Sequence, residues 1–297
     1  MFLSSLDSTL QIAFLYAIPA FAVIFSFRIL GFADLTPDGS YTLGAAISGV
    51  LLINGFSNIV ALFAAFFAGA SAGVFTAILH NKIGVSKLLS GILVMLMLYS
   101  ISLRIMGTSN LSLMRVDTFL GSLPSLKGSF IPFLSTAILS FGTYFILFSL
   151  LRTRIGLCLR AVGDSPTAME YRGFRRGPFY IFGLSISNGI AACAGAIISQ
   201  YQGFVDVSMG NGLVILSLAA VVMGETLLRP TKIYSLLLAV PIGMCLYQVI
   251  IAIVLRLGLA PTDMKIVTAI LALVFISIDK IKINRSRTSR IIGNHNV

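Results

Sequence analysis

Apolar runs of about 20 residues recur along this chain with few interrupting charges. The 297 residues are 57% hydrophobic and only 10% charged, whereas a soluble domain has about 25% charged residues. A run of about 20 apolar residues forms a helix long enough to cross a hydrocarbon core about 30 Å thick. The runs are too long for the strands of a membrane β-barrel, which alternate over about ten residues. The sequence therefore predicts an all-α, polytopic transmembrane helix bundle.

The chain divides into nine apolar segments. They are residues 10–30, 41–54, 56–79, 88–106, 130–151, 179–201, 212–228, 233–255 and 264–279. The segment at 41–54 is short and follows Asp34, Pro37, Asp38 and Gly39, so we expect a broken or re-entrant piece there. We predict about eight to nine spans in a single transmembrane domain, residues 1–297.

The basic residues indicate how the spans are oriented. If the N-terminus lies outside and the spans alternate, 16 of the 21 Lys and Arg residues fall on one face. Loops rich in Lys and Arg stay in the cytoplasm. We therefore expect a multi-pass membrane protein with residues 152–178 and the basic tail, 280–297, in the cytoplasm. The tail is suited to contact lipid headgroups.

Small residues recur at the spacing of helix-packing motifs. Gly69 and Gly73 form a GxxxG pattern in the third segment, and Ser185 with Gly189 and Ala191 with Gly195 repeat the spacing in the sixth. In lipid, such residues let two helix backbones approach closely. Ordinary bundle packing is the favoured interpretation, and a moving interface is the alternative.

The sequence contains no pattern typical of an enzyme. The two histidines, His80 and His295, and the three cysteines, Cys158, Cys193 and Cys245, lack the spacing of a metal or disulfide site. No phosphate-binding G-x-x-x-x-G-K-[ST] motif is present. The net charge of +11 comes without a nucleic-acid recognition motif. We expect neither a catalytic residue nor a bound cofactor nor a nucleic-acid partner. If the protein works uphill on ATP, another subunit must bind the ATP and its Mg²⁺.

A few polar residues lie in or beside the apolar segments. Asp34, Asp38, Gly39 and Ser40 precede the short second segment, where they could line a solute path. Alternatively, Asp38 or Ser40 caps the helix that follows. Asn188 and Gln200 lie within the sixth segment, where interhelical hydrogen bonding is the default role and solute contact the alternative. We expect Glu225 to pair with Arg229 one turn later.

The basic insert at residues 154–177 is the longest polar stretch between two spans. Ser165 is suited to cap a helix with Pro166 in its first turn, and Asp164 adds favourable negative charge there. Gly173 suits the stop. These residues predict a short helix at 166–172. Either this helix is a rigid docking element or the insert is a solvated amphipathic linker.

Three stretches together resemble one family. The stretch "GLCLRAVGDSPTAMEYRGF" resembles the cytoplasmic coupling loop of bacterial ABC transporter permeases of the branched-chain amino acid and ribose type. The matching residues are Gly156, Leu159, Arg160, Ala161, Gly163, Ser165, Ala168 and Gly173. "FADLTPDGSYTLGAA" and "DVSMGNGLVILSLAAVVMGE" resemble two further signatures, so the resemblance spans residues 32–225. Asp164-Ser165 departs from the family, where many members have a polar residue followed by Asn.

The resemblance implies the permease of a binding-protein-dependent importer in the bacterial cytoplasmic (inner) membrane. Its partners would be a second, identical permease, two cytoplasmic ATPases and an extracytoplasmic solute-binding protein. The implied coupling residues are Arg160, Ala161, Gly163, Asp164, Ser165, Pro166, Ala168 and Gly173. An amino acid is the expected solute, because the first signature is closest to a branch that includes aromatic amino acid permeases. A sugar or nucleoside permease, or a stand-alone transporter or channel, is the alternative.

If this loop docks on an ATPase, a bulky residue at Gly163 or Ala168 should uncouple transport from ATP hydrolysis. We expect such variants to assemble nearly normally.

Overall fold

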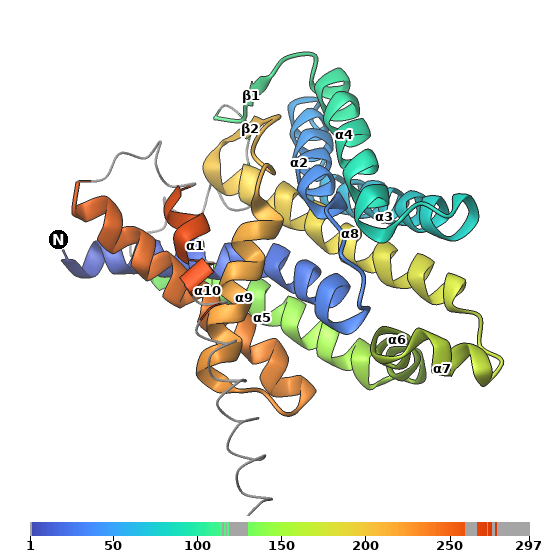
Figure 1. Cartoon of the computed structure of the whole chain (residues 1–297). Helices are drawn as coiled ribbons and strands as arrows, with labels where there is room; N and C mark the ends of the chain where they lie inside the picture. The colour runs from blue at the N-terminus through green and yellow to red at the C-terminus, as the bar shows by residue number, and fades with distance from the viewer. Residues whose placement is uncertain are drawn as a thin grey trace, which may run out of the picture.

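The computed structural model is a bundle of apolar helices (Figure 1). It describes residues 2–114, 116, 118, 130–258, 266–271, 273, 274 and 277. The helices in this part of the chain are α1 (Phe2–Ile24), α2 (Thr36–Ile53), α3 (Asn58–Ile78), α4 (Lys87–Met106), α5 (Phe130–Arg152), α6 (Arg154–Asp164), α7 (Pro166–Tyr171), α8 (Arg176–Gln202), α9 (Leu213–Leu228) and α10 (Ile233–Arg256). Short π-helical segments extend α1 (η1, Phe25–Ile29) and α3 (η2, Leu79–Ile83). The predicted helical bundle is confirmed.

Six of the described helical segments are long and apolar enough to cross a membrane. They are Asp7–Ile29, Asn58–Ile83, Lys87–Met106, Phe133–Arg152, Arg176–Gln202 and Ile233–Arg256. The helix α9 is also apolar but is shorter than these six. The ninth predicted segment, 264–279, lies partly outside the described residues. These helices correspond to predicted segments.

The second predicted segment is a continuous helix that starts earlier than expected. α2 begins at Thr36, so Pro37, Asp38 and Ser40 lie in its first turns and not in a break before it. Proline fits there because its missing N–H is not needed in a first turn. The carboxylate of Asp34 accepts a hydrogen bond from Thr36 N at 2.9 Å, which satisfies a backbone amide at the helix start. Nearly all of α2 is buried.

The helix α8 is the central element of the bundle. It packs mainly against α3, α2 and α1, while α9 and α10 pack against each other and against α1 (Figure 1). A Cβ atom on Gly73 of α3 would overlap the backbone of Leu184 in α8, and one on Gly195 of α8 would overlap Tyr41 O in α2. Backbones therefore touch at Gly69, Gly73 and Gly195, whereas Gly189 packs against the ring of Phe66.

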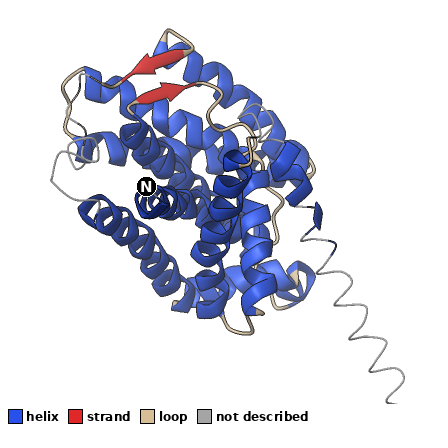
Figure 2. Ribbon diagram, turned by 90° about the vertical axis from the view of Figure 1, so that its left-hand side faces the viewer, coloured by secondary structure: helices blue, strands red, loops and turns tan. Residues whose placement is uncertain are grey.

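The two ends of the bundle differ in structure. One end carries an antiparallel two-stranded ribbon, β1 (Asn110–Ser112) with β2 (Phe204–Asp206), which we did not predict (Figure 2). At the other end, Lys87 Nζ donates to Gly31 O at 2.8 Å, and Asn81 Nδ2 donates to Gly177 O at 3.1 Å. The predicted basic loops are thus joined at the end opposite the ribbon.

Candidate functional site

The predicted path residues of α2 and α8 form a buried hydrogen-bond network. Ser40 Oγ donates to Asn188 Oδ1 at 2.8 Å, and Asn188 Nδ2 donates to Asp34 Oδ2 at 2.9 Å. All three side chains are fully buried. Two turns further along α2, Ser48 Oγ accepts from Gln200 Nε2 at 3.3 Å. The network joins α2 to α8 along several turns.

Asp38 caps a different helix from the one we expected. Its two carboxylate oxygens accept hydrogen bonds from Gly212 N at 3.0 Å and Val214 N at 2.7 Å, both at the start of α9. A carboxylate at a helix N-terminus satisfies unpaired amides and complements the helix dipole. The prediction that Asp38 or Ser40 caps α2 is wrong, because both side chains point across to other helices. Neighbouring Gly39 packs closely against α4.

The main role of this network is to hold helices together. Each side chain satisfies another buried group, as polar residues in membrane helices commonly do. The network tightly fastens α2 to α8 and α9. Whether a solute meets Asp34, Asp38, Gly39, Ser40, Asn188 or Gln200 stays a prediction.

The basic insert folds into two short helices where we predicted one. The side chain of Thr153 caps α6 by accepting from Gly156 N at 3.2 Å. The sequence of α6 is amphipathic, with Leu159 and Val162 on the buried face. This pattern could have predicted the helix. α7 starts at Pro166 as predicted, but the hydroxyl of Ser165 forms no capping hydrogen bond.

The end of α7 is as the sequence predicted. Gly173 adopts the left-handed conformation with φ of 83°, and the next amide, Phe174 N, bonds to Met169 O at 3.1 Å. Tyr171 is 93% exposed, and Ala168 and Asp164 are also exposed. The insert therefore presents a polar and aromatic surface away from the bundle.

Gly163 in α6 packs against the backbone at the end of η1. A Cβ atom on Gly163 would overlap Ile29 O at the end of η1. Gly31, with φ of 61°, also lies against the backbone of Gly163. The expectation that a bulky residue at Gly163 leaves assembly nearly normal conflicts with this backbone contact. Ala168 is exposed, so a bulky residue there is compatible with normal assembly.

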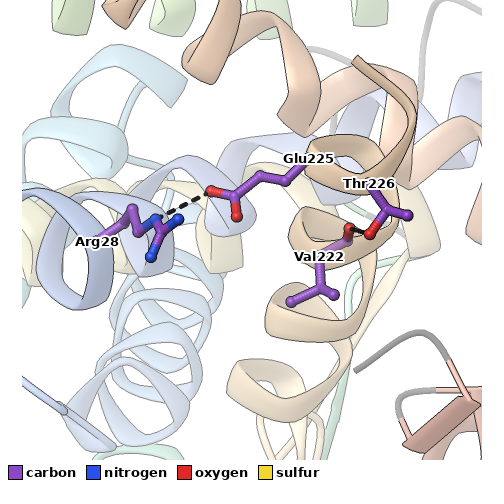
Figure 3. Close-up of polar contacts among 4 residues, drawn as sticks. All are labelled: Arg28, Val222, Glu225 and Thr226. Atoms are coloured by element: carbon purple, nitrogen blue, oxygen red, sulfur yellow. Dashed lines mark hydrogen bonds and ion pairs between the residues drawn. The ribbon is translucent and has the colours of Figure 1, made fainter. Parts of the chain in front are cut away.

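An ion pair links α1 to α9 at the same end. Arg28 Nε in η1 lies 3.3 Å from Glu225 Oε1 (Figure 3). The predicted pair between Glu225 and Arg229 is wrong: Arg229 ends α9 with φ of 46°, and its backbone N–H, not its side chain, bonds to Glu225 O at 2.8 Å. The ion pair therefore holds two helices that are distant in sequence.

A cavity of about 660 Å³ lies among α1, α8, α9, α10 and residues 266–271. Sequence reasoning missed it, because its walls come from five separate segments. Its polar lining residues include Gln202, Asn211, Gln248 and Thr268. Among the described residues, no cluster of three or more His, Cys, Asp or Glu could hold a metal ion, and the three cysteines are free.

A multi-pass bundle with a cavity at one end and an exposed two-helix insert at the other is the architecture of a membrane permease. Residues 5–278 match the family described as "Branched-chain amino acid transport system / permease component". The chain belongs to this family of ABC-type permeases.

Curated relatives cover most of the chain. A tyrosine transport system permease protein of Clostridioides difficile is 38% identical over 97% of this chain and 95% of its own length. An uncharacterised protein, RP368, of Rickettsia prowazekii is 33% identical over 86% of this chain and 90% of its own. The autoinducer 2 import system permease protein LsrC of an Enterobacter species is 29% identical over 72% of this chain and 60% of its own. No solved structure matches the chain.

Proposed function

We propose that this chain is the permease of an amino acid importer and that tyrosine or a closely similar amino acid is its solute. The observation that carries the proposal is the match along almost the whole length of a permease named for tyrosine transport. The relatives named for autoinducer 2 import are less similar and less completely covered, so a sugar-like solute is the second candidate.

The proposed assembly has two copies of this chain, two cytoplasmic ATPases and an extracytoplasmic binding protein. ATP and Mg²⁺ bind to the ATPases, and this chain acts as a transport subunit without catalytic chemistry of its own. The end with the basic loops and the C-terminus faces the cytoplasm, as the distribution of Lys and Arg supports. The basic tail contacts anionic lipid headgroups.

In this assembly the insert formed by α6 and α7 receives the movement of the ATPase. Its exposed residues, including Ala168 and Tyr171, form the docking surface. Its buried residues, Leu159 and Met169, belong to the same hydrophobic core as α1, α8 and α9. Because that core is closely packed, a displacement of the insert displaces the spans.

The test is uptake by the purified complex. The permease is reconstituted in vesicles with its ATPase and binding protein, and ATP-dependent uptake of labelled tyrosine is compared with that of a sugar. Ala168→Trp alters the docking surface, while Leu257→Trp, at a position 79% exposed beyond the far end of α10, is the matched control. We expect Ala168→Trp to lower uptake at least tenfold and the control to retain it.

Two outcomes would contradict the proposal. Uptake in vesicles that lack the ATPase would identify a stand-alone transporter or channel. ATP-dependent uptake of the sugar and not of any amino acid would reassign the solute. The orientation is tested separately in the cysteine-free protein carrying Tyr171→Cys, which an impermeant thiol reagent should label only after the membrane is opened.

A further inference from the structure

We infer that the cavity among α1, α8, α9 and α10 is a binding site for the uncharged side chain of the solute, with room for an aromatic ring. This inference rests on the proposed function and adds a location and a chemical class. The volume of about 660 Å³ falls within the range of about 300–1,000 Å³ that is typical of small-molecule sites.

The cavity lies toward the end of the bundle that carries the β1–β2 ribbon. Its walls include Tyr201 near the end of α8 and Leu213 at the start of α9, together with Tyr16 in the middle of α1. In the proposed orientation this end faces the binding protein. A solute released there would meet the cavity before it met the basic end of the bundle.

The lining selects against charge. None of the described residues that line the cavity is Asp, Glu, Lys, Arg or His. Burying a charged group without a partner costs several kcal/mol or more. The ammonium and carboxylate of an amino acid therefore stay in water at the mouth, and only a neutral side chain enters.

The walls are suited to an aromatic ring with a polar tip. Three tyrosines contribute from three helices, and all three hydroxyls have partners: Tyr16 hydrogen-bonds to Gln202, Tyr201 Oη donates to Gln11 Oε1 at 3.3 Å, and Tyr247 Oη lies 2.7 Å from Thr268 Oγ1. The side chain of Gln248 also lines the cavity and forms no hydrogen bond to another described residue. It is available to a phenol hydroxyl.

A lipid acyl chain fits this cavity less well. Apolar surface predominates, but Gln202, Asn211, Gln248 and Thr268 interrupt it. An acyl chain would cover Gln248, whose side-chain amide forms no hydrogen bond to another described residue, and would leave that amide without a partner. A ring with a hydroxyl can hydrogen-bond to it.

The wall formed by α9 is held in place at both ends. Asp38 bonds to the amides at its start, and Glu225 near its last turn pairs with Arg28. The cavity therefore lies beside a helix whose two ends are fastened to α2 and to the end of α1. A preformed site of this kind binds without the cost of ordering its own walls.

The test compares one substitution at two positions of α10. Ile251 lines the cavity, whereas Ile253, two residues further on, is 53% exposed and is not part of the lining. The reconstituted complex carries either Ile251→Trp, which fills the cavity, or Ile253→Trp, its control. At saturating loaded binding protein we expect the first variant to transport tyrosine at least tenfold more slowly and the second to match the wild type.

A second variant covers the case in which Ile251→Trp does not fold. Ile251→Ala enlarges the cavity, and we expect it to raise the ratio of tryptophan to tyrosine uptake at least threefold. The inference is overturned if both variants transport tyrosine at the wild-type rate with an unchanged ratio, or if mass spectrometry finds a lipid retained by the wild type and lost from Ile251→Trp without any change in uptake. If the wild-type complex transports no amino acid at all, the proposed function fails first, which separates the two claims.

Discussion

The contact between α2 and α8 permits a sharp test of the fold, through Gly195→Ala. Gly195 in α8 faces the carbonyl oxygen of Tyr41 in α2, and an added Cβ atom would overlap that oxygen. A flexible side chain could swing away, but a backbone carbonyl within a helix cannot. Because carbon contacts are optimal at about 3.5–4.0 Å, the two helices must separate by more than about 1 Å.

The separation strains more than one contact. Over-packing a core costs about 1–3 kcal/mol. Moving α8 away also stretches the bond between Ser40 and Asn188, now 2.8 Å, and the bond between Gln200 and Ser48, now 3.3 Å. Each such bond contributes about 0.5–1.5 kcal/mol. Alanine favours the helix by about 1 kcal/mol, so we expect Gly195→Ala to lower the free energy of unfolding by about 1–5 kcal/mol.

A matched control lies in α5. Gly142 is also a glycine inside an apolar helix, but an added Cβ atom there meets nothing within 4 Å. Gly142→Ala should be neutral or stabilise slightly, because alanine favours the helix by about 1 kcal/mol. Combining Gly195→Ala with Gly44→Ala, whose Cβ would overlap Ala192 O in the same interface, should cost less than the sum, because the first change already opens the space.

The three free cysteines supply the assay. Each is partly buried, so a thiol-reactive dye reports unfolding of the purified protein as temperature rises. We expect a clear fall in the melting temperature for Gly195→Ala and no fall for Gly142→Ala. Equal shifts for both variants, or strictly additive losses for the double variant, would refute the argument that backbones touch at this interface.

Three further predictions concern stability: the first two use the same measurement, and the third uses circular dichroism, because cysteines do not react with a thiol dye at pH 3. Asp38→Ala should destabilise the protein by about 1–3 kcal/mol, and Asp38→Asn by less, because it keeps one acceptor for the α9 amides. A double-mutant cycle of Arg28→Gln with Glu225→Gln should give a coupling below about 1 kcal/mol, because the Arg28 side chain is 64% exposed. Hydrogen bonds from the Ser208 side chain and backbone hold the pKa of Asp206 below its usual value, so their stabilisation is present above about pH 4 and is lost as pH falls through the lowered pKa. Ser208→Ala should therefore lower the melting temperature at pH 7 more than at pH 3; a pH-independent difference would contradict this.

The helices themselves were the most predictable part of the structure. A chain that crosses lipid must satisfy its backbone hydrogen bonds locally, so each apolar run of sufficient length becomes a helix whatever its neighbours are. The start of α2 was predicted too late because its first residues are polar. Pro37 and Asp38 are typical of a break in an exposed chain, but in a protein interior the polar groups find partners on α8 and α9.

The choice of partners was not predictable from the sequence. The spacing of Gly69 and Gly73 indicates that some helix approaches closely, but it does not identify α8 as that helix. The same holds for Glu225, which has a basic residue one turn away and pairs instead with Arg28, nearly 200 positions distant. Local spacing describes one helix surface, while pairing depends on how whole helices are placed.

The placement of α9 unites the features that sequence reasoning treated separately. Its first residues wall the cavity and are capped by Asp38, and its last turns carry Glu225. This helix has 16 residues and is shorter than the six long spans, so hydropathy alone does not identify it as a span. Yet α9 is fastened at both ends and packs along its length against α10 and α1, so a displacement at one end reaches the other. The Ile251 variants test the cavity from its α10 wall, and the Arg28–Glu225 cycle tests the far end of α9. If Glu225→Gln lowers tyrosine uptake and leaves the melting temperature unchanged, the two ends of α9 are coupled.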